Sequence, residues 1–141
     1  MTKASAASGK LARFYNPSYF WSAAAAVWTA CILGMTVSPL SRMDWVLATL
    51  GDKTLHAIAF GLGAVVWALA LRTPRLSRWA PRFYGAAISF AIGGIVEILQ
   101  NSVPSRQSDS RDFMANTIGI LIALGILLAT ARYDKRDIKL K

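Results

Sequence analysis

The chain has 141 residues, of which 55% are hydrophobic, and its mean hydropathy is +0.41. This composition is too apolar for an ordinary soluble domain of such a length. The net charge of +9 would also suit a nucleic-acid-binding protein, but the basic residues form short clusters beside apolar runs, so we expect no nucleic-acid partner.

Four apolar runs are long enough to cross a membrane as helices, because about 20 helical residues cover roughly 30 Å of hydrocarbon. A soluble helical bundle would show a polar stripe at helical spacing, and residues 118–131 have none. The sequence therefore predicts an all-α integral membrane protein with a four-helix domain at residues 20–131. The predicted transmembrane runs are 20–37, 55–71, 83–99 and 113–131.

The first apolar run follows a basic segment, so a cleaved signal peptide is an alternative. Its apolar stretch exceeds the roughly 7–15 residues of a signal sequence, and no Ala-x-Ala cleavage site ends it. We expect a retained helix preceded by a cytoplasmic segment at residues 1–19. The only cysteine, Cys31, has no intrachain partner and indicates no disulfide.

Positive charge is distributed unevenly around the four runs. Two loops contain acidic and basic residues that cancel, whereas the other segments are strongly basic. By the positive-inside rule the basic segments are cytoplasmic, so we expect an N-in, C-in protein of the inner membrane with a basic cytoplasmic tail at residues 132–141. The basic residues on that side, which we expect to contact anionic lipids, are Lys3, Lys10, Arg13, Arg72, Arg75, Arg78, Arg82, Arg132, Lys135, Arg136, Lys139 and Lys141.

Small residues recur at four-residue spacing on the last three predicted helices. Such stripes allow helix backbones to approach closely in a membrane. We expect these helices to pack on one another, and a homo-oligomer stays open. The stripes comprise Ala57 and Gly61; Gly85, Ser89 and Gly93; and Ala115, Gly119 and Ala123.

The second helix carries polar residues at its predicted extracytoplasmic start. Asp52 and His56 are four residues apart and share a face. An N-cap role is the simpler alternative for Asp52. That role does not explain His56, which lies one turn deeper and needs a partner.

The third helix ends with Glu97 and Gln100, which are three residues apart on one face. A carboxylate near a helix C-terminus is disfavoured by the helix dipole. We therefore expect Glu97 to pair with a cation supplied by His56, Lys53 or Arg106.

The fourth helix is entered through a polar segment that ends in Asp112 and Asn116, again four residues apart. Asp109 can cap this helix and Asp112 can favour its first turn. Asn116 lies deeper, so its amide needs a hydrogen-bond partner from another helix.

These residues together resemble the VanZ-like family of membrane proteins. The resemblance rests on Asp52-Lys53-x-x-His56-x-x-x-Phe60, on Glu97-x-x-Gln100, and on Arg106 with Asp112, Asn116 and Gly119. It covers residues 51–128, and it departs at Pro104-Ser105, where the family often has Pro-Gly. The family takes its name from teicoplanin resistance, so the resemblance implies a membrane fold, this site and a link to glycopeptide susceptibility.

Three functions fit the predicted cluster. The first is binding the polar head of a lipid or lipid-linked envelope precursor through Asp52, Lys53, His56, Glu97, Gln100, Arg106, Asp112 and Asn116. The second is a hydrolase or transferase acting on an envelope lipid, with His56, Glu97 and Asp112 as candidate catalytic residues. The third is a structural role in joining the helices.

The motifs in the sequence limit these functions further. No HExxH, GxSxG or metal-spaced histidine set is present, so we expect no metal and no cofactor. No charge lies near the predicted midplane, which disfavours a transporter.

Overall fold

The computed structural model describes residues 17–37, 51–103 and 109–131. Within these ranges the chain forms four α-helices and no strand. The helices are α2 (Pro17–Val37), α4 (Asp52–Ala70), α5 (Ala80–Gln100) and α6 (Ser110–Ala131). Arg106, the tail at residues 132–141 and most of the segment at residues 1–19 lie outside the described ranges.

All four helices are long and apolar enough to cross a membrane. The predicted all-α fold with four transmembrane helices is therefore confirmed, and the chain is a multi-pass membrane protein. The second, third and fourth helices each begin three residues before the predicted apolar run, because their polar first turns are also helical. At the start of α5, Pro81 is tolerated because an N–H in the first turn has no intrahelical acceptor.

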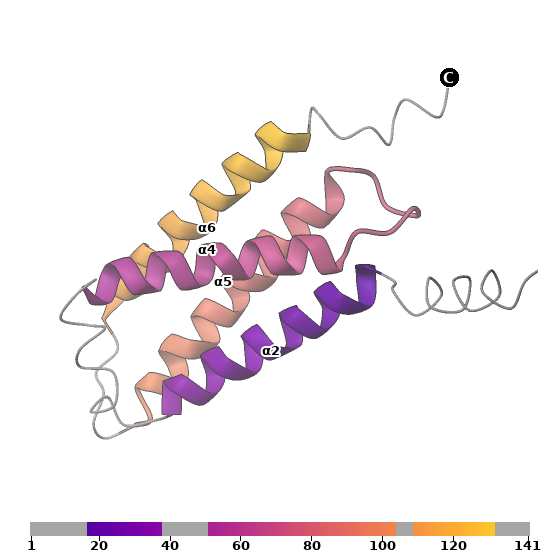
Figure 1. The fold of residues 1–141 in the computed structure, drawn as a ribbon. Helices are drawn as coiled ribbons and strands as arrows, with labels where there is room; N and C mark the ends of the chain where they lie inside the picture. The colour runs from indigo at the N-terminus through magenta and orange to yellow at the C-terminus, as the bar shows by residue number, and fades with distance from the viewer. Residues whose placement is uncertain (1–16, 38–50, 104–108, 132–141) are drawn as a thin grey trace, which may run out of the picture.

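The helices lie side by side, with α4 in contact with each of the other three (Figure 1). The first residues of α2, the turn between α4 and α5, and the last residues of α6 lie at one end of the bundle. We call this the arginine end, after Arg72, Arg75, Arg78 and Arg82. The opposite end, which contains the starts of α4 and α6, we call the polar end.

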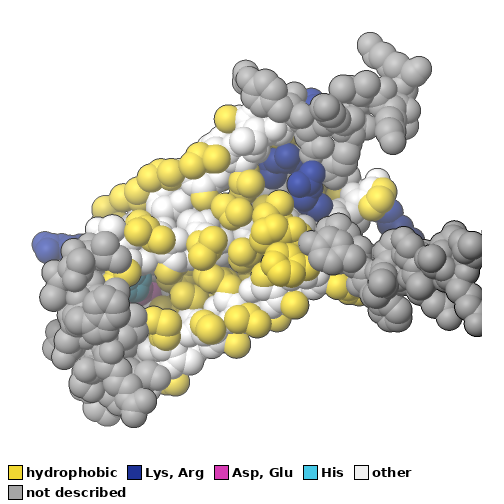
Figure 2. Space-filling view, in the orientation of Figure 1, with side chains coloured by type: hydrophobic (Ala, Val, Ile, Leu, Met, Phe, Trp, Pro, Cys, Tyr) yellow, Lys and Arg dark blue, Asp and Glu magenta, His cyan; other side chains and the backbone are white. Residues whose placement is uncertain are grey.

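Apolar, basic and acidic side chains occupy different parts of the bundle along its length. Figure 2 shows apolar side chains over the middle, lysine and arginine side chains mainly at the arginine end, and histidine and acidic side chains at the polar end. This agrees with a membrane-spanning bundle. The N-in, C-in orientation stays a prediction from the positive-inside rule.

Close backbone contacts join α4 to α5 and α6, as the stripes of small residues predict. A Cβ added at Gly119 would lie 1.9 Å from the carbonyl oxygen of Ala57, and one at Gly85 would lie 2.5 Å from the backbone nitrogen of Ala68. The Ser89 hydroxyl donates a 2.8 Å hydrogen bond to the carbonyl of Phe60. The helix backbones therefore touch, and no side chain larger than hydrogen fits at Gly119.

Trp28 of α2 makes both a hydrogen bond and an aromatic contact with α4. The Trp28 indole Nε1 donates a 3.0 Å hydrogen bond to the carbonyl of Ala59. Its ring packs edge-on against Phe60, with ring centroids 5.8 Å apart, and a Cβ at Gly63 would clash with it. This contact places an aromatic layer directly below the polar end.

Candidate functional site

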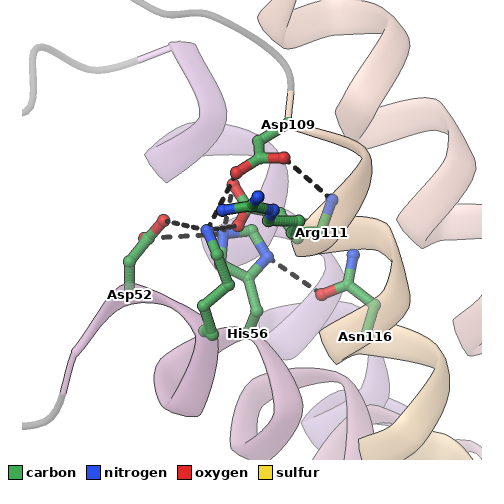
Figure 3. Close-up of polar contacts among 7 residues, drawn as sticks. Asp52, His56, Asp109, Arg111 and Asn116 are labelled. Carbon is green, nitrogen blue, oxygen red and sulfur yellow. Dashed lines mark hydrogen bonds and ion pairs between the residues drawn. The ribbon is translucent and has the colours of Figure 1, made fainter.

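Polar side chains from the first turns of α4 and α6 point toward one another at the polar end (Figure 3). They meet because glycine and alanine let the two helix backbones approach one turn deeper. Both helices present their N-terminal dipoles here, which favours carboxylates. The cluster consists of Asp52, Lys53 and His56 from α4 with Asp109, Asp112 and Asn116 at the start of α6.

Lys53 lies among three carboxylates. Its Nζ donates hydrogen bonds to Asp112 Oδ1 at 2.5 Å and to Asp109 Oδ2 at 3.1 Å. Asp52 Oδ2 lies 3.6 Å away. The ammonium carries three N–H donors, so these acids leave it little capacity for an anion from outside.

His56 makes a different contact with each of its ring nitrogens. Nδ1 lies 2.9 Å from Asn116 Oδ1. Nε2 faces Asp52 Oδ1 at 3.7 Å and Asp112 Oδ2 at 3.9 Å, which is too far for a hydrogen bond. The imidazole is stacked on the Phe60 ring, with an interplanar angle of 12°. His56 was predicted to need a partner, and the structure shows that this partner is Asn116, with one carboxylate from each helix near the other ring nitrogen.

Asn116 is the deepest polar residue of the cluster and is 1% exposed. Its partner comes from another helix, as predicted. The amide Nδ2 is buried and donates to no group in the described ranges. It lies near Gly93 of α5, where an added Cβ would be 3.4 Å away. The unbonded N–H groups of the Asn116 amide therefore lie between the cluster and α5.

Glu97 and Gln100 do not bond to the cluster. Glu97 is near enough to interact electrostatically with Asp112 and His56, yet its Oε1 is buried and accepts no hydrogen bond in the described part of the chain. No ion pair joins Glu97 to Lys53 or His56 there, so a cation partner within the described residues is not found. Gln100 is buried at the end of α5 and makes no hydrogen bond to His56, Asp112 or Asn116. Arg106, the third candidate partner, lies outside the described residues.

The two proposed helix caps have different outcomes. Gly51, with φ of 73°, is the N-cap of α4, and Asp52 makes no capping hydrogen bond, so the N-cap alternative for Asp52 is wrong. Asp109 precedes α6, and its Oδ1 accepts a 2.9 Å hydrogen bond from the backbone N–H of Arg111. That bond and the bond from Lys53 lower the pKa of Asp109.

Asp109 was predicted as a cap alone, and its contact with Lys53 adds it to the cluster. The signal was its three-residue spacing from Asp112, which places both carboxylates on one face of the first turn. Phe60 also belongs to the site, as the surface on which His56 rests. The described cluster thus combines several carboxylates, one ammonium group and one oriented imidazole.

Comparison with known protein families identifies the family of the chain. The model of the VanZ/LLP1 family matches residues 6–131. No curated protein and no solved structure matches the chain. The family match covers most of the chain, including all four helices and the whole cluster, so the chain belongs to the VanZ/LLP1 family.

Proposed function

We propose that the cluster binds the polar head of a lipid or lipid-linked envelope precursor on the extracytoplasmic side of the inner membrane. The observation that carries this proposal is the gradient of exposure across the cluster. The side chains of Asp52 and Lys53 are 49% and 46% exposed, whereas that of Asp112 is 9% exposed. A head group at the membrane surface would meet exposed charges first and buried ones below them.

The charges of the described residues favour a particular kind of head group. Lys53 is already bonded to carboxylates, so the cluster offers mainly hydrogen-bond acceptors to a ligand. Carboxylates recognise hydroxyl and amino groups, which abound in sugar and peptide head groups. A phosphate would need another cation, and Arg106 is suited to a bidentate contact.

The lipid tail would follow the bundle surface away from the cluster. Ile58 and Leu62 of α4 and Met114 and Ile118 of α6 are all more than half exposed. Within each pair the side chains are four residues apart and share a face. These apolar faces begin close to the polar end, so a single lipid can contact both a face and the cluster.

A purely structural role is the weaker explanation. The backbone contacts at Gly119 and Gly85 already join the helices below the cluster. Interhelical hydrogen bonds in membrane proteins contribute only about 0.6 kcal/mol on average. Several ionisable groups at one end would therefore add little to the stability of the bundle.

Purified protein and the lipids that co-purify with it test the binding proposal. We expect wild-type protein in mild detergent to retain a lipid class, identified by mass spectrometry. We expect Asn116→Leu to reduce this retention about tenfold, because His56 loses the buried hydrogen bond that orients it, a loss of about 1–3 kcal/mol. Thr117→Val is the matched control, since the Thr117 hydroxyl bonds only to the backbone of its own helix. Equal retention by both variants would contradict head-group binding.

Antibiotic susceptibility tests the link to glycopeptides. A deletion strain should differ from wild type toward teicoplanin-type glycopeptides more than toward other envelope-active antibiotics. Complementation by wild type should restore the phenotype, and Arg106→Ala should not, although the variant still reaches the membrane. A fully active Arg106→Ala variant would argue against a phosphate or carboxylate contact at that residue.

An enzyme acting on an envelope lipid is the second candidate, and the orientation of His56 favours it. Asn116 holds one ring nitrogen and leaves the other near Asp112, an arrangement suited to a general base. Lipid extracts of the wild type and of a His56→Ala strain distinguish the candidates. An accumulated lipid in the variant supports catalysis, and identical profiles would exclude a lipid hydrolase or transferase with His56 as its base.

A further inference from the structure

Asp52 and Asp112 each divide their two carboxylate oxygens between different partners. Asp52 Oδ2 and Asp112 Oδ1 face Lys53. The other oxygens, Asp52 Oδ1 and Asp112 Oδ2, face His56 Nε2 from either side. Lys53 therefore neutralises one side of each carboxylate and leaves the side toward His56 without a cation.

The bond to Asn116 fixes which nitrogen of His56 carries a proton. Asn116 presents its carbonyl oxygen, which can only accept, so His56 Nδ1 is the donor in the 2.9 Å bond. In the neutral ring Nε2 then carries the lone pair. Three atoms that carry lone pairs in the neutral ring state, Asp52 Oδ1, His56 Nε2 and Asp112 Oδ2, thus face a common point, and a cation between them would be attracted by all three.

We propose that Asp52, His56 and Asp112 form a binding site for a divalent transition-metal cation. One potential ligand atom from each residue lies within 4.8 Å of the other two. Ligands about 2.1 Å from a metal lie about 3 to 3.5 Å apart, so small side-chain rotations close the site. The cation would draw Asp52 inward, and Asp52 is half exposed and not held by a capping bond.

The donor set indicates which cation binds. One imidazole and two carboxylates suit Mn²⁺ or Zn²⁺ better than Mg²⁺ or Ca²⁺, which prefer oxygen ligands alone. Asn116 performs the role of the outer hydrogen-bond partner that orients a metal-binding histidine. Three protein ligands leave coordination positions open.

A bound cation would explain how an acidic cluster takes a phosphate-bearing head group. Its open positions would accept phosphate or carboxylate oxygens, which the surrounding acids alone would repel. This consequence rests on the function proposed above. The cation site itself does not, because its geometry involves no lipid.

The test is cation binding to the purified full chain in detergent after chelator treatment. Mn²⁺ binding is followed by electron paramagnetic resonance and Zn²⁺ binding by calorimetry. We expect one site per chain in wild type and at least about tenfold weaker binding in His56→Ala and Asp112→Asn. Circular dichroism verifies that each variant keeps its helices.

Two further variants test the geometry of the site. Thr117→Val removes a hydroxyl that bonds only to the backbone of its own helix, so we expect its affinity to stay within about threefold of wild type. Lys53→Gln removes a competing positive charge while keeping a long side chain, so we expect tighter binding. Wild-type protein without measurable binding, or His56→Ala with wild-type affinity, would overturn the proposal.

The lipid-retention measurement separates this inference from the proposed function. Cation binding without any retained lipid would overturn the proposed function and leave the cation site standing. Lipid retention that is unchanged by chelator, in protein that binds no cation, would overturn the cation site and leave the proposed function standing.

Discussion

At the polar end, burial and bonding divide the residues into those that orient and those that meet solvent. Asn116 is buried and holds His56 by a 2.9 Å contact. Asp52, Lys53 and Asp109 are each 42% to 49% exposed. Ion pairs between exposed groups are screened by water and contribute little stability. The buried Asn116 and Asp112 therefore fix the geometry, and the exposed residues are free to rearrange around a ligand.

The lowered pKa of Asp109 should make the stability of the folded protein depend on pH in acid. Its pKa in the folded protein lies below its ordinary value, because the Arg111 N–H and Lys53 stabilise the carboxylate. The resulting stability is fully present above the unfolded-state pKa of about 4 and is lost as the pH falls through the lower, folded pKa. We expect Asp109→Asn to reduce the fall in melting temperature below about pH 4, as measured in detergent. A fall as steep as that of wild type would show that other carboxylates determine it.

At the scale of the helices, α4 is the shared partner and its small residues set the spacing. The starts of α4 and α6 come together at the cluster because Gly119 lies on the backbone of Ala57 one turn deeper. The α5 helix meets α4 at Gly85, near the arginine end. There the buried Arg82 donates through Nε to the carbonyl of Leu127 at 2.9 Å, which joins α5 to α6. Helix contacts along the bundle thus determine where the polar first turns meet.

Gly119 and Gly125 form a matched pair on α6. A Cβ at Gly119 would lie 1.9 Å from the Ala57 carbonyl oxygen, whereas one at Gly125 would meet open space. We expect Gly119→Ala to lower the free energy of unfolding by about 1–3 kcal/mol, because the backbones must separate. Gly125→Ala should cause no loss. Thermal unfolding in detergent, followed by circular dichroism, measures both. A stable Gly119→Ala variant would mean that α4 and α6 do not touch there.

At the scale of the whole molecule, a group of arginine side chains and the carboxylates of the cluster lie at opposite ends of the described bundle. Arg72, Arg75, Arg78 and Arg82 lie at one end, and the carboxylates of the cluster lie at the other. Basic residues beside transmembrane helices are retained on the cytoplasmic side. The predicted orientation therefore gives the cluster access to the envelope and not to the cytosol.

Two serine positions test this orientation. Ser77 lies in the turn between α4 and α5 and Ser102 lies just beyond α5, and both are exposed. We expect a membrane-impermeant maleimide to label Ser102→Cys in intact spheroplasts and Ser77→Cys only after permeabilisation. A Cys31→Ala background removes the native thiol. The reverse pattern would place the cluster in the cytoplasm and exclude an extracytoplasmic ligand.

The sequence by itself determined the helices, because length and hydrophobicity decide which segments can leave water. It also identified His56, Asp112 and Asn116, since spacing of four residues places side chains on one helix face. Spacing along the chain says nothing about which oxygen of a carboxylate faces which partner. Asp52 and Asp112 each turn one oxygen toward Lys53 and the other toward His56. Only the tertiary structure shows this arrangement.

Two expectations about the polar residues depend on how the helices pack. Glu97 was expected to pair with His56, Lys53 or Arg106. Within the described residues its buried Oε1 is unbonded and Lys53 bonds to carboxylates of α6 instead, while Arg106 lies outside those residues. The absence of a metal-spaced histidine set led us to expect no metal, which stays a prediction; the packing of α4 on α6 places His56 near two carboxylates, and the proposed cation site depends on that packing. Helix packing depends on backbone contacts such as that of Gly119 with Ala57, so only the tertiary structure decided which polar residues meet.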